Sequence, residues 1–204
     1  LVLFHGLEGS SQSHYARAFA HWAHASGWDY VVPHFRGCSG ELNRAPRTYH
    51  SGDHAEIDWI LRRLSLAHAG PTVAVGVSLG GNALLRWAQE AGSEASQVVK
   101  AVVAISSPVD LAAAGHALGR GFNRQTYTRM FLNSMKPKAL AKLQQFPGLV
   151  NEAALRASRD LYEYDNAFTA PLHGFASTED YWALSKNSAK ALATMSSTGA
   201  RTSH

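Results

Sequence analysis

Near the middle of the chain, the pentapeptide Gly76-Val77-Ser78-Leu79-Gly80 has the residue types and spacing of a site for nucleophilic attack on a carbonyl. A strand is predicted over residues 72–75 and a helix over residues 81–90, so Ser78 would occupy the tip of a sharp strand-to-helix turn that exposes its hydroxyl. The pentapeptide alone would occur by chance in about one of eight such chains, and the flanking elements therefore carry the prediction. The small residues that the tight bend requires are Gly76, Gly80 and Gly81. A plain glycine-rich turn is the alternative.

A second glycine-rich loop, His5-Gly6-Leu7-Glu8-Gly9, follows an apolar run at residues 1–4 that is typical of a buried parallel strand. Attack by Ser78 on an ester would need two N–H donors for the developing oxyanion. The amides of Leu7 and Leu79 are the predicted oxyanion hole. The alternative is a turn that only leads the chain into a helix.

Predicted strands and helices alternate through the first half of the chain, which favours a parallel sheet covered on both faces. Strands are predicted at residues 1–4, 28–32, 72–75 and 100–106, and helices at residues 13–26, 51–69 (with Ser51 as N-cap) and 81–90. After Pro108-Val109-Asp110-Leu111 the alternation stops, and residues 112–180 are predicted to be helical or irregular, without a strand. A helical block in this position is typical of a lid over an active site, and a helical subdomain with only a packing role is the alternative. The predicted domains are a partial core (1–111), a helical lid (112–182) and an unassigned tail (183–204).

The composition is that of a globular protein, with 204 residues, 46% of them hydrophobic and 17% charged. Nineteen Lys and Arg against 15 Asp and Glu give a net charge of +4 without a basic stripe, so no nucleic-acid partner is predicted. No run approaches 18 apolar residues, so no membrane span is predicted. One cysteine, Cys38, excludes an internal disulfide. The composition does not determine the cellular localisation, and the cytoplasm is the favoured prediction.

Eight histidines in the first third of the chain raise the question of a metal site. His50 and His54 are four residues apart, with Asp53 and Asp58 nearby. His50 precedes the predicted helix, however, and the chain has no His-Glu-x-x-His or Cys-x-x-Cys pattern. No metal and no other cofactor is therefore predicted.

Several motifs in order resemble the α/β-hydrolase superfamily, and within it the lid-bearing esterase group that contains bacterial YheT and the human abhydrolase domain-containing proteins 1 and 3. The likeness spans residues 1–190. The segments that carry it are His5-Gly6-Leu7-Glu8-Gly9-Ser10, His34-Phe35-Arg36-Gly37-Cys38-Ser39-Gly40, Tyr49-His50-Ser51-Gly52, Gly76-Val77-Ser78-Leu79-Gly80-Gly81-Asn82, Ser106-Ser107-Pro108-Val109-Asp110-Leu111 and Thr169-Ala170-Pro171-Leu172-His173-Gly174-Phe175 with Asp180-Tyr181-Trp182. The resemblance implies a partial α/β-hydrolase fold of about four strands with a helical lid, Ser78 as nucleophile, and medium-chain carboxylic esters as substrates.

The acid and the histidine of a Ser-His-acid triad have no clear counterpart in this chain. The superfamily places them after later strands, whereas residues 185–204 contain no predicted strand. Asp110 is a candidate acid that also stands where a helix N-cap is needed. His173 belongs to the lid motif and His204 to a polar terminus, so neither is a convincing base. Weak or absent activity is therefore expected.

Leu1 already lies in an apolar strand and the family pattern stops after about Lys190, which predicts a fragment lacking parts at both ends. Its outer strands would then lack their usual neighbours, and self-association through these edges is a hypothesis. The leading prediction is a serine ester hydrolase that forms an acyl-enzyme on Ser78. The alternatives are a non-catalytic binding module on a degenerate hydrolase fold and an acyltransferase with an alcohol acceptor.

Overall fold

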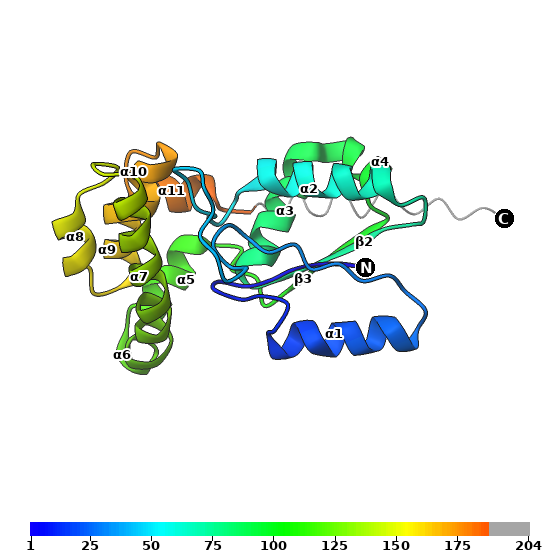
Figure 1. Cartoon of the computed structure of the whole chain (residues 1–204), viewed down its shortest axis with the longest axis horizontal. Coiled ribbons are helices and arrows are strands. Elements are labelled where there is room, and N and C mark those ends of the chain that lie inside the picture. The colour runs from blue at the N-terminus through cyan, green and yellow to red at the C-terminus, as the bar shows by residue number, and fades with distance from the viewer. Residues whose placement is uncertain (188–204) are drawn as a thin grey trace. The chain divides into compact units, whose positions relative to one another are not determined.

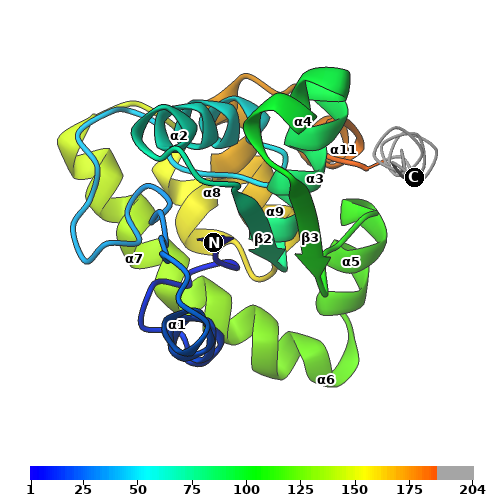
Figure 2. The ribbon, with the colours of Figure 1, turned by 90° about the vertical axis from the view of Figure 1, so that its right-hand side faces the viewer.

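Three parallel strands form the sheet that carries Ser78 in this computed structural model, which describes residues 1–187. They are β1 (Val2–Phe4), β2 (Val73–Val77) and β3 (Ala101–Ile105), in the order β1-β2-β3. The strand that precedes Ser78 is therefore central (Figure 2). Leu3 is paired with Val75, and Val75 with Val103. These strands are apolar throughout, as buried parallel strands are. β1 and most of β2 are buried, whereas β3, at the edge of the sheet, is largely exposed.

The strand predicted at residues 28–32 does not form, and the expected sheet of about four strands has three. Val31 makes only an isolated parallel bridge to Val2. Its N–H donates to Leu1 O and its carbonyl accepts from Leu3 N, both at 2.9 Å. The next N–H on the same side of this ladder would be that of Pro33, which has none, so the pairing ends after one residue.

Helices cover both faces of the sheet, as the alternating pattern predicts (Figures 1 and 2). Helix α1 (His14–Ala25) lies on one face. On the other lie α2 (His54–Ala67), α3 (Leu79–Ala91) and, after the 3₁₀ turn Gly92–Glu94, α4 (Ala95–Val98). Ser51 is not the N-cap of α2; Asp53 is. Gly52 has φ +77°, which is incompatible with a helix and delays its start.

The described residues form two compact units. The first, which we call the sheet unit, consists of residues 1–34, 51–109 and, at its described end, Lys186 and Asn187. The second, the helical unit, consists of Phe35–His50 and Asp110–Ser185. Within residues 1–187, no helix is long and apolar enough to cross a membrane.

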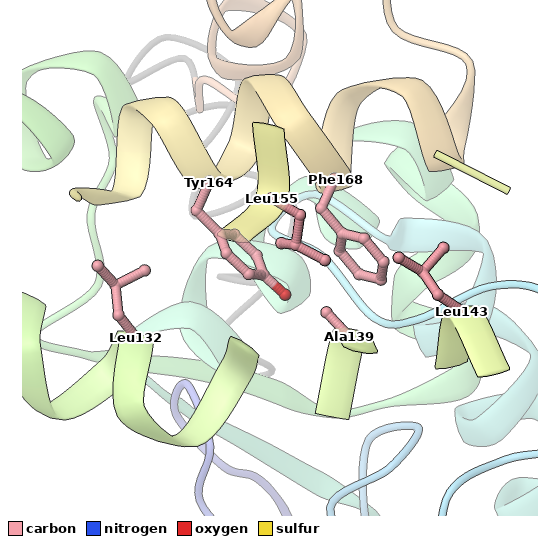
Figure 3. Packing of buried hydrophobic residues seen from close by; sticks show 6 residues of the cluster. All are labelled: Leu132, Ala139, Leu143, Leu155, Tyr164 and Phe168. Carbon is pink, nitrogen blue, oxygen red and sulfur yellow. The ribbon is translucent and has the colours of Figure 1, made fainter. Parts of the chain in front are cut away.

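The helical unit contains no strand in its described residues, as predicted for residues 112–180. Its helices are α5 (Leu111–Leu118), α6 (Gly121–Asn123), the π-helical turn η2 (Arg124–Thr128), α7 (Arg129–Gln145), α8 (Glu152–Ala157), α9 (Leu161–Tyr164), the π-helical turn η3 (Asp165–Thr169), α10 (Ala170–His173) and α11 (Thr178–Leu184). Figure 3 shows its core, in which side chains of α7, α8, α9 and η3 converge. These are Leu132, Ala139, Leu143, Leu155, Tyr164 and Phe168. The unit thus has a hydrophobic core of its own.

A buried lysine joins Phe35–His50 to the helical unit. The ammonium of Lys142, on α7, donates to the carbonyl oxygens of Asn43 and Ala45 and, at 3.0 Å, to Oε1 of Gln145. The residue is fully buried, and burial lowers the pKa of its amine. Backbone carbonyls therefore satisfy a cation that would otherwise be costly to bury.

Candidate active site

Ser78 has a backbone conformation that few non-glycine residues adopt, with φ 53° and ψ −120°. It joins the end of β2 to the first residue of α3. Its N–H donates to Ile105 O of β3 at 2.8 Å, and its carbonyl accepts from Asn82 N at 3.0 Å. Such a conformation costs on the order of 1–3 kcal/mol and persists only where the surroundings enforce it. The strand, the helix and the neighbouring strand all hold it here.

Three glycines allow β2, α3 and β1 to approach closely enough for this turn. A Cβ on Gly76 would lie 2.5 Å from the Cα of Gly81, and one on Gly81 would lie 2.8 Å from Gly76 O. A Cβ on Gly80 would lie 2.5 Å from Phe4 O. Each distance is far below a normal contact, so the backbone leaves no room for a side chain at these positions.

The loop after β1 lies against Ser78. A Cβ added to Gly6 would be 3.3 Å from the Cβ of Ser78. Two bonds hold the loop: Gly9 N donates to Gly6 O at 2.9 Å, and Gly6 N donates to the hydroxyl of Tyr15 on α1 at 2.9 Å. Tyr15 lies in the helix predicted over residues 13–26, and no role was predicted for its hydroxyl. The Tyr15 side chain of α1 therefore helps to hold the loop after β1 in place.

The two predicted oxyanion donors, Leu7 and Leu79, come from this loop and from the start of α3. Within residues 1–187, neither amide N–H donates a hydrogen bond. Leu79 is the first residue of α3, where the helix dipole favours negative charge. Their role in binding an oxyanion stays a prediction.

Two histidines of the sheet unit, His5 and His34, are engaged by backbone groups. His5 is fully buried, and its Nδ1 donates to Gly6 O at 2.9 Å, because a carbonyl can only accept. His34 accepts at Nε2 from Ser11 N at 3.0 Å, and the two rings lie 6.0 Å apart. In the described part of the chain, the Ser78 hydroxyl makes no hydrogen bond to either ring.

The other candidate acid and bases have different positions. Asp110 is the N-cap of α5, and its Oδ1 accepts from Ala113 N at 2.9 Å. His173 lies in the helical unit, where its ring is 4.3 Å from that of His50 and its Nε2 is 3.4 Å from Thr48 Oγ1. His204 lies outside the described residues. No group of three His, Cys, Asp or Glu side chains suited to a metal ion occurs among the residues that the structure describes.

Asn82, one turn after Ser78, was not predicted to have a role. It is fully buried, and its Nδ2 donates to Pro108 O at 2.7 Å. Its carbonyl accepts from Nδ2 of Asn187 at 3.2 Å, and Asn187 N in turn donates to Val109 O at 2.9 Å. The first turn of α3 is thus bonded to Pro108 and Asn187, which both belong to the sheet unit. A polar residue before the apolar run Ala83-Leu84-Leu85 is the only sequence signal for this role.

A strand, a tight turn bearing a strained serine, and a helix, with a glycine loop beside them, define a nucleophile elbow of the α/β-hydrolase type. The family model described as "alpha/beta hydrolase fold" matches residues 1–148. The chain belongs to this family.

Relatives from bacteria and eukaryotes agree with this assignment. The chain is 45% identical over 186 residues to "Putative esterase YheT" of Escherichia coli, covering 89% of this chain and 54% of that protein. It is 24% identical over 183 residues to human "Phospholipase ABHD3", with 89% and 44% covered, and 24% identical over 192 residues to "Monoacylglycerol lipase" of Saccharomyces cerevisiae, with 89% and 42% covered. The chain spans about half the length of these relatives.

Proposed function

We propose that this chain carries the acyl-accepting site of a serine ester hydrolase, with Ser78 as nucleophile. The observation that carries the proposal is the conformation of Ser78, held between glycines that leave no space for a Cβ. Such strain persists where it serves a site, because a relaxed turn would join the same strand and helix at lower cost.

The reaction would begin with attack of the Ser78 hydroxyl oxygen on the carbonyl carbon of an ester. The carbonyl oxygen becomes an oxyanion, which the N–H groups of Leu7 and Leu79 would stabilise. The hydroxyl proton goes to a base, the bond to the alkoxy group breaks, and the alcohol leaves with a proton. Water then attacks the acyl-serine and releases the carboxylic acid, and an alcohol in place of water would give an acyl transfer.

Carboxylic esters are the proposed substrates, and esters with a medium-length acyl chain are the narrower proposal. The names of the relatives support the first part, because an esterase, a phospholipase and a monoacylglycerol lipase all cleave esters. Residues 112–182 are proposed as a lid. Their own hydrophobic core supports this role, since a separately packed unit can move as one body.

Slow turnover is proposed for this chain. Within residues 1–187, no hydrogen bond links the Ser78 hydroxyl to a histidine, and loss of a triad member typically costs several powers of ten in rate. The same observation favours a second candidate function, a binding module that has kept the elbow without catalysis.

The test is a pre-steady-state assay with p-nitrophenyl butyrate, octanoate and palmitate. A burst of p-nitrophenol, up to one per chain and fastest with octanoate, is expected because acylation would precede a slower hydrolysis. Ser78→Ala should abolish the burst. Ser96→Ala is the matched control, because Ser96 lies outside the elbow and donates only to Ser93 O. Equal release by wild type and Ser78→Ala would refute the enzyme function, and binding of octanoate without any release would favour the binding module.

A further inference from the structure

A hollow of about 580 Å³ in the helical unit is lined by cationic and amide side chains. The polar residues around it are Arg124, Gln125, Arg129, Asn133, Lys136 and Arg159. Four of these are cationic, and no Asp or Glu lines the hollow. Its volume falls in the range of small-molecule sites, about 300–1,000 Å³.

Three parts of the helical unit contribute these side chains. Arg124 comes from the π-helical turn η2. Arg129, Asn133 and Lys136 follow on α7 at intervals of four and three residues, which places them on one face of that helix. The remaining guanidinium, that of Arg159, comes from the connection between α8 and α9.

Side-chain to backbone hydrogen bonds at the start of α9 fix the main chain at Arg159. Asp160 is the N-cap of α9 and accepts from Glu163 N at 2.9 Å, and Glu163 Oε2 accepts from Arg159 N at 2.6 Å. The two nearest carboxylates in sequence are therefore engaged by backbone N–H groups, and Arg159 lines the hollow.

The arginines around the hollow have no counter-ions in the described chain. No ion pair or side-chain hydrogen bond engages the guanidiniums of Arg124, Arg129 or Arg159 within residues 1–187. Arg156, in the same unit but not in the hollow, is paired with Glu152 at 2.6 Å. Cations gathered without a counter-ion repel one another, so the arrangement favours an anion in the hollow.

The fourth cation has a different role. Lys136 donates to the carbonyl oxygens of Arg156 and Ser158, at 2.9 Å for the first. These bonds tie the middle of α7 to the end of α8. They leave its positive charge at the hollow, and the guanidiniums supply most of the free N–H donors.

We infer that this hollow binds a phosphate group carried on a larger molecule. Guanidinium groups bind phosphate oxygens through paired N–H···O bonds, and three of them with a fixed ammonium match the charge of a phosphate ester better than that of a single carboxylate. The amides of Gln125 and Asn133 add neutral donors. Three exposed apolar residues lie on the same stretch of chain: Phe122 (77% exposed), Tyr127 (53%) and Met130 (56%). Contact of an apolar group on the phosphate-bearing molecule with these side chains is part of the inference.

The test measures binding of two phosphate sources to the whole chain. One is inorganic phosphate, followed by isothermal titration calorimetry. The other source is phosphatidylglycerol in vesicles, whose binding is followed by co-sedimentation of the protein. Vesicles of phosphatidylcholine serve as the comparison. The variant Arg129→Gln/Arg159→Gln should weaken binding at least tenfold, because each charge-assisted hydrogen bond contributes about a factor of ten or more. The matched control Arg62→Gln/Arg156→Gln removes the same charge from arginines already paired with carboxylates.

The outcomes distinguish the sources. Binding of phosphate that is lost only in Arg129→Gln/Arg159→Gln supports a site for a free phosphate compound. Binding of phosphatidylglycerol vesicles with the same dependence supports a lipid headgroup, and Phe122→Ser should then weaken it as well. Equal loss in both double variants would show a non-specific charge effect and overturn the inference. Absence of binding to either source would overturn it too. None of these measurements depends on activity at Ser78.

Discussion

Gly80→Ala should destabilise the sheet unit, because Gly80 lies directly against the backbone of β1 and its loop. An added Cβ would lie 2.5 Å from Phe4 O and 2.7 Å from Phe4 C, and it would also meet His5 O. All three are backbone atoms of β1 and its loop, so no side chain can rotate away. Helix α3 would have to move by about 1 Å to restore normal contacts.

The expected loss of unfolding free energy is about 2 kcal/mol. Overpacking of this kind costs up to about 3 kcal/mol where the backbone cannot yield. Replacing glycine by alanine in a helix raises the free energy of unfolding by about 1 kcal/mol, because alanine reduces the conformational entropy of the unfolded chain. The steric cost therefore exceeds the gain.

Urea unfolding followed by tryptophan fluorescence measures this change. Four of the five tryptophans, Trp22, Trp28, Trp59 and Trp87, belong to the sheet unit. Gly70→Ala is the matched control, because its Cβ would meet only atoms of the His68 side chain, which is 52% exposed, and no backbone atom. Equal unfolding midpoints for the two variants would refute the steric argument, and Gly80→Ala should also slow acylation of Ser78.

Three further predictions concern polar groups. Asn82→Leu should lower the free energy of unfolding by about 1–3 kcal/mol, because Pro108 O loses its hydrogen-bond donor. Amide hydrogen exchange should become faster at Asn187 N while the amides of β1 stay protected. Unchanged exchange at Asn187 N would contradict this prediction. Lys142→Met should expose residues 35–50 to limited proteolysis, since their carbonyls lose the ammonium, and a digestion pattern like that of wild type would count against this role. Burial raises the pKa of Asp165 from 3.8 to about 6. The stability that the protonated Asp165 side chain contributes to the fold is therefore complete below about pH 4 and is lost as the pH rises through 6. Asp165→Asn keeps a hydrogen-bond acceptor for Trp182 Nε1 and should make the helical unit about 1–2 kcal/mol more stable at pH 7. Thermal unfolding of both proteins at pH 4 and at pH 7 measures this difference. An equal effect of the substitution at the two pH values would refute the prediction.

Features set by local sequence could be predicted, and features set by distant partners could not. The strand, turn and helix around Ser78 follow from β-branched residues, glycines and helix formers that are adjacent in the chain. The strand at residues 28–32 was predicted wrongly because its composition is apolar while Pro33 ends the ladder. The N-cap of α2 was misplaced because a glycine conformation, +77° at Gly52, cannot be seen in composition.

Long-range polar contacts leave no local signal. The bond between Asn82 and Asn187 joins residues 105 apart, and that between Lys142 and Asn43 joins residues 99 apart. Asn187 falls after the last family motif, and Lys142 lies in a helix whose other lysines are less buried. Folding alone brings these partners together, so their roles could be found only from the structure.

The measurement that tests the central proposal most directly is labelling with a fluorophosphonate followed by peptide mapping. Ser78 should carry a single adduct in wild type and in Ser96→Ala, formed slowly because no base is bonded to its hydroxyl within residues 1–187, and Ser78→Ala should carry none. An unlabelled wild-type chain, or an adduct that persists after Ser78→Ala, would contradict the assignment of Ser78 as the nucleophile.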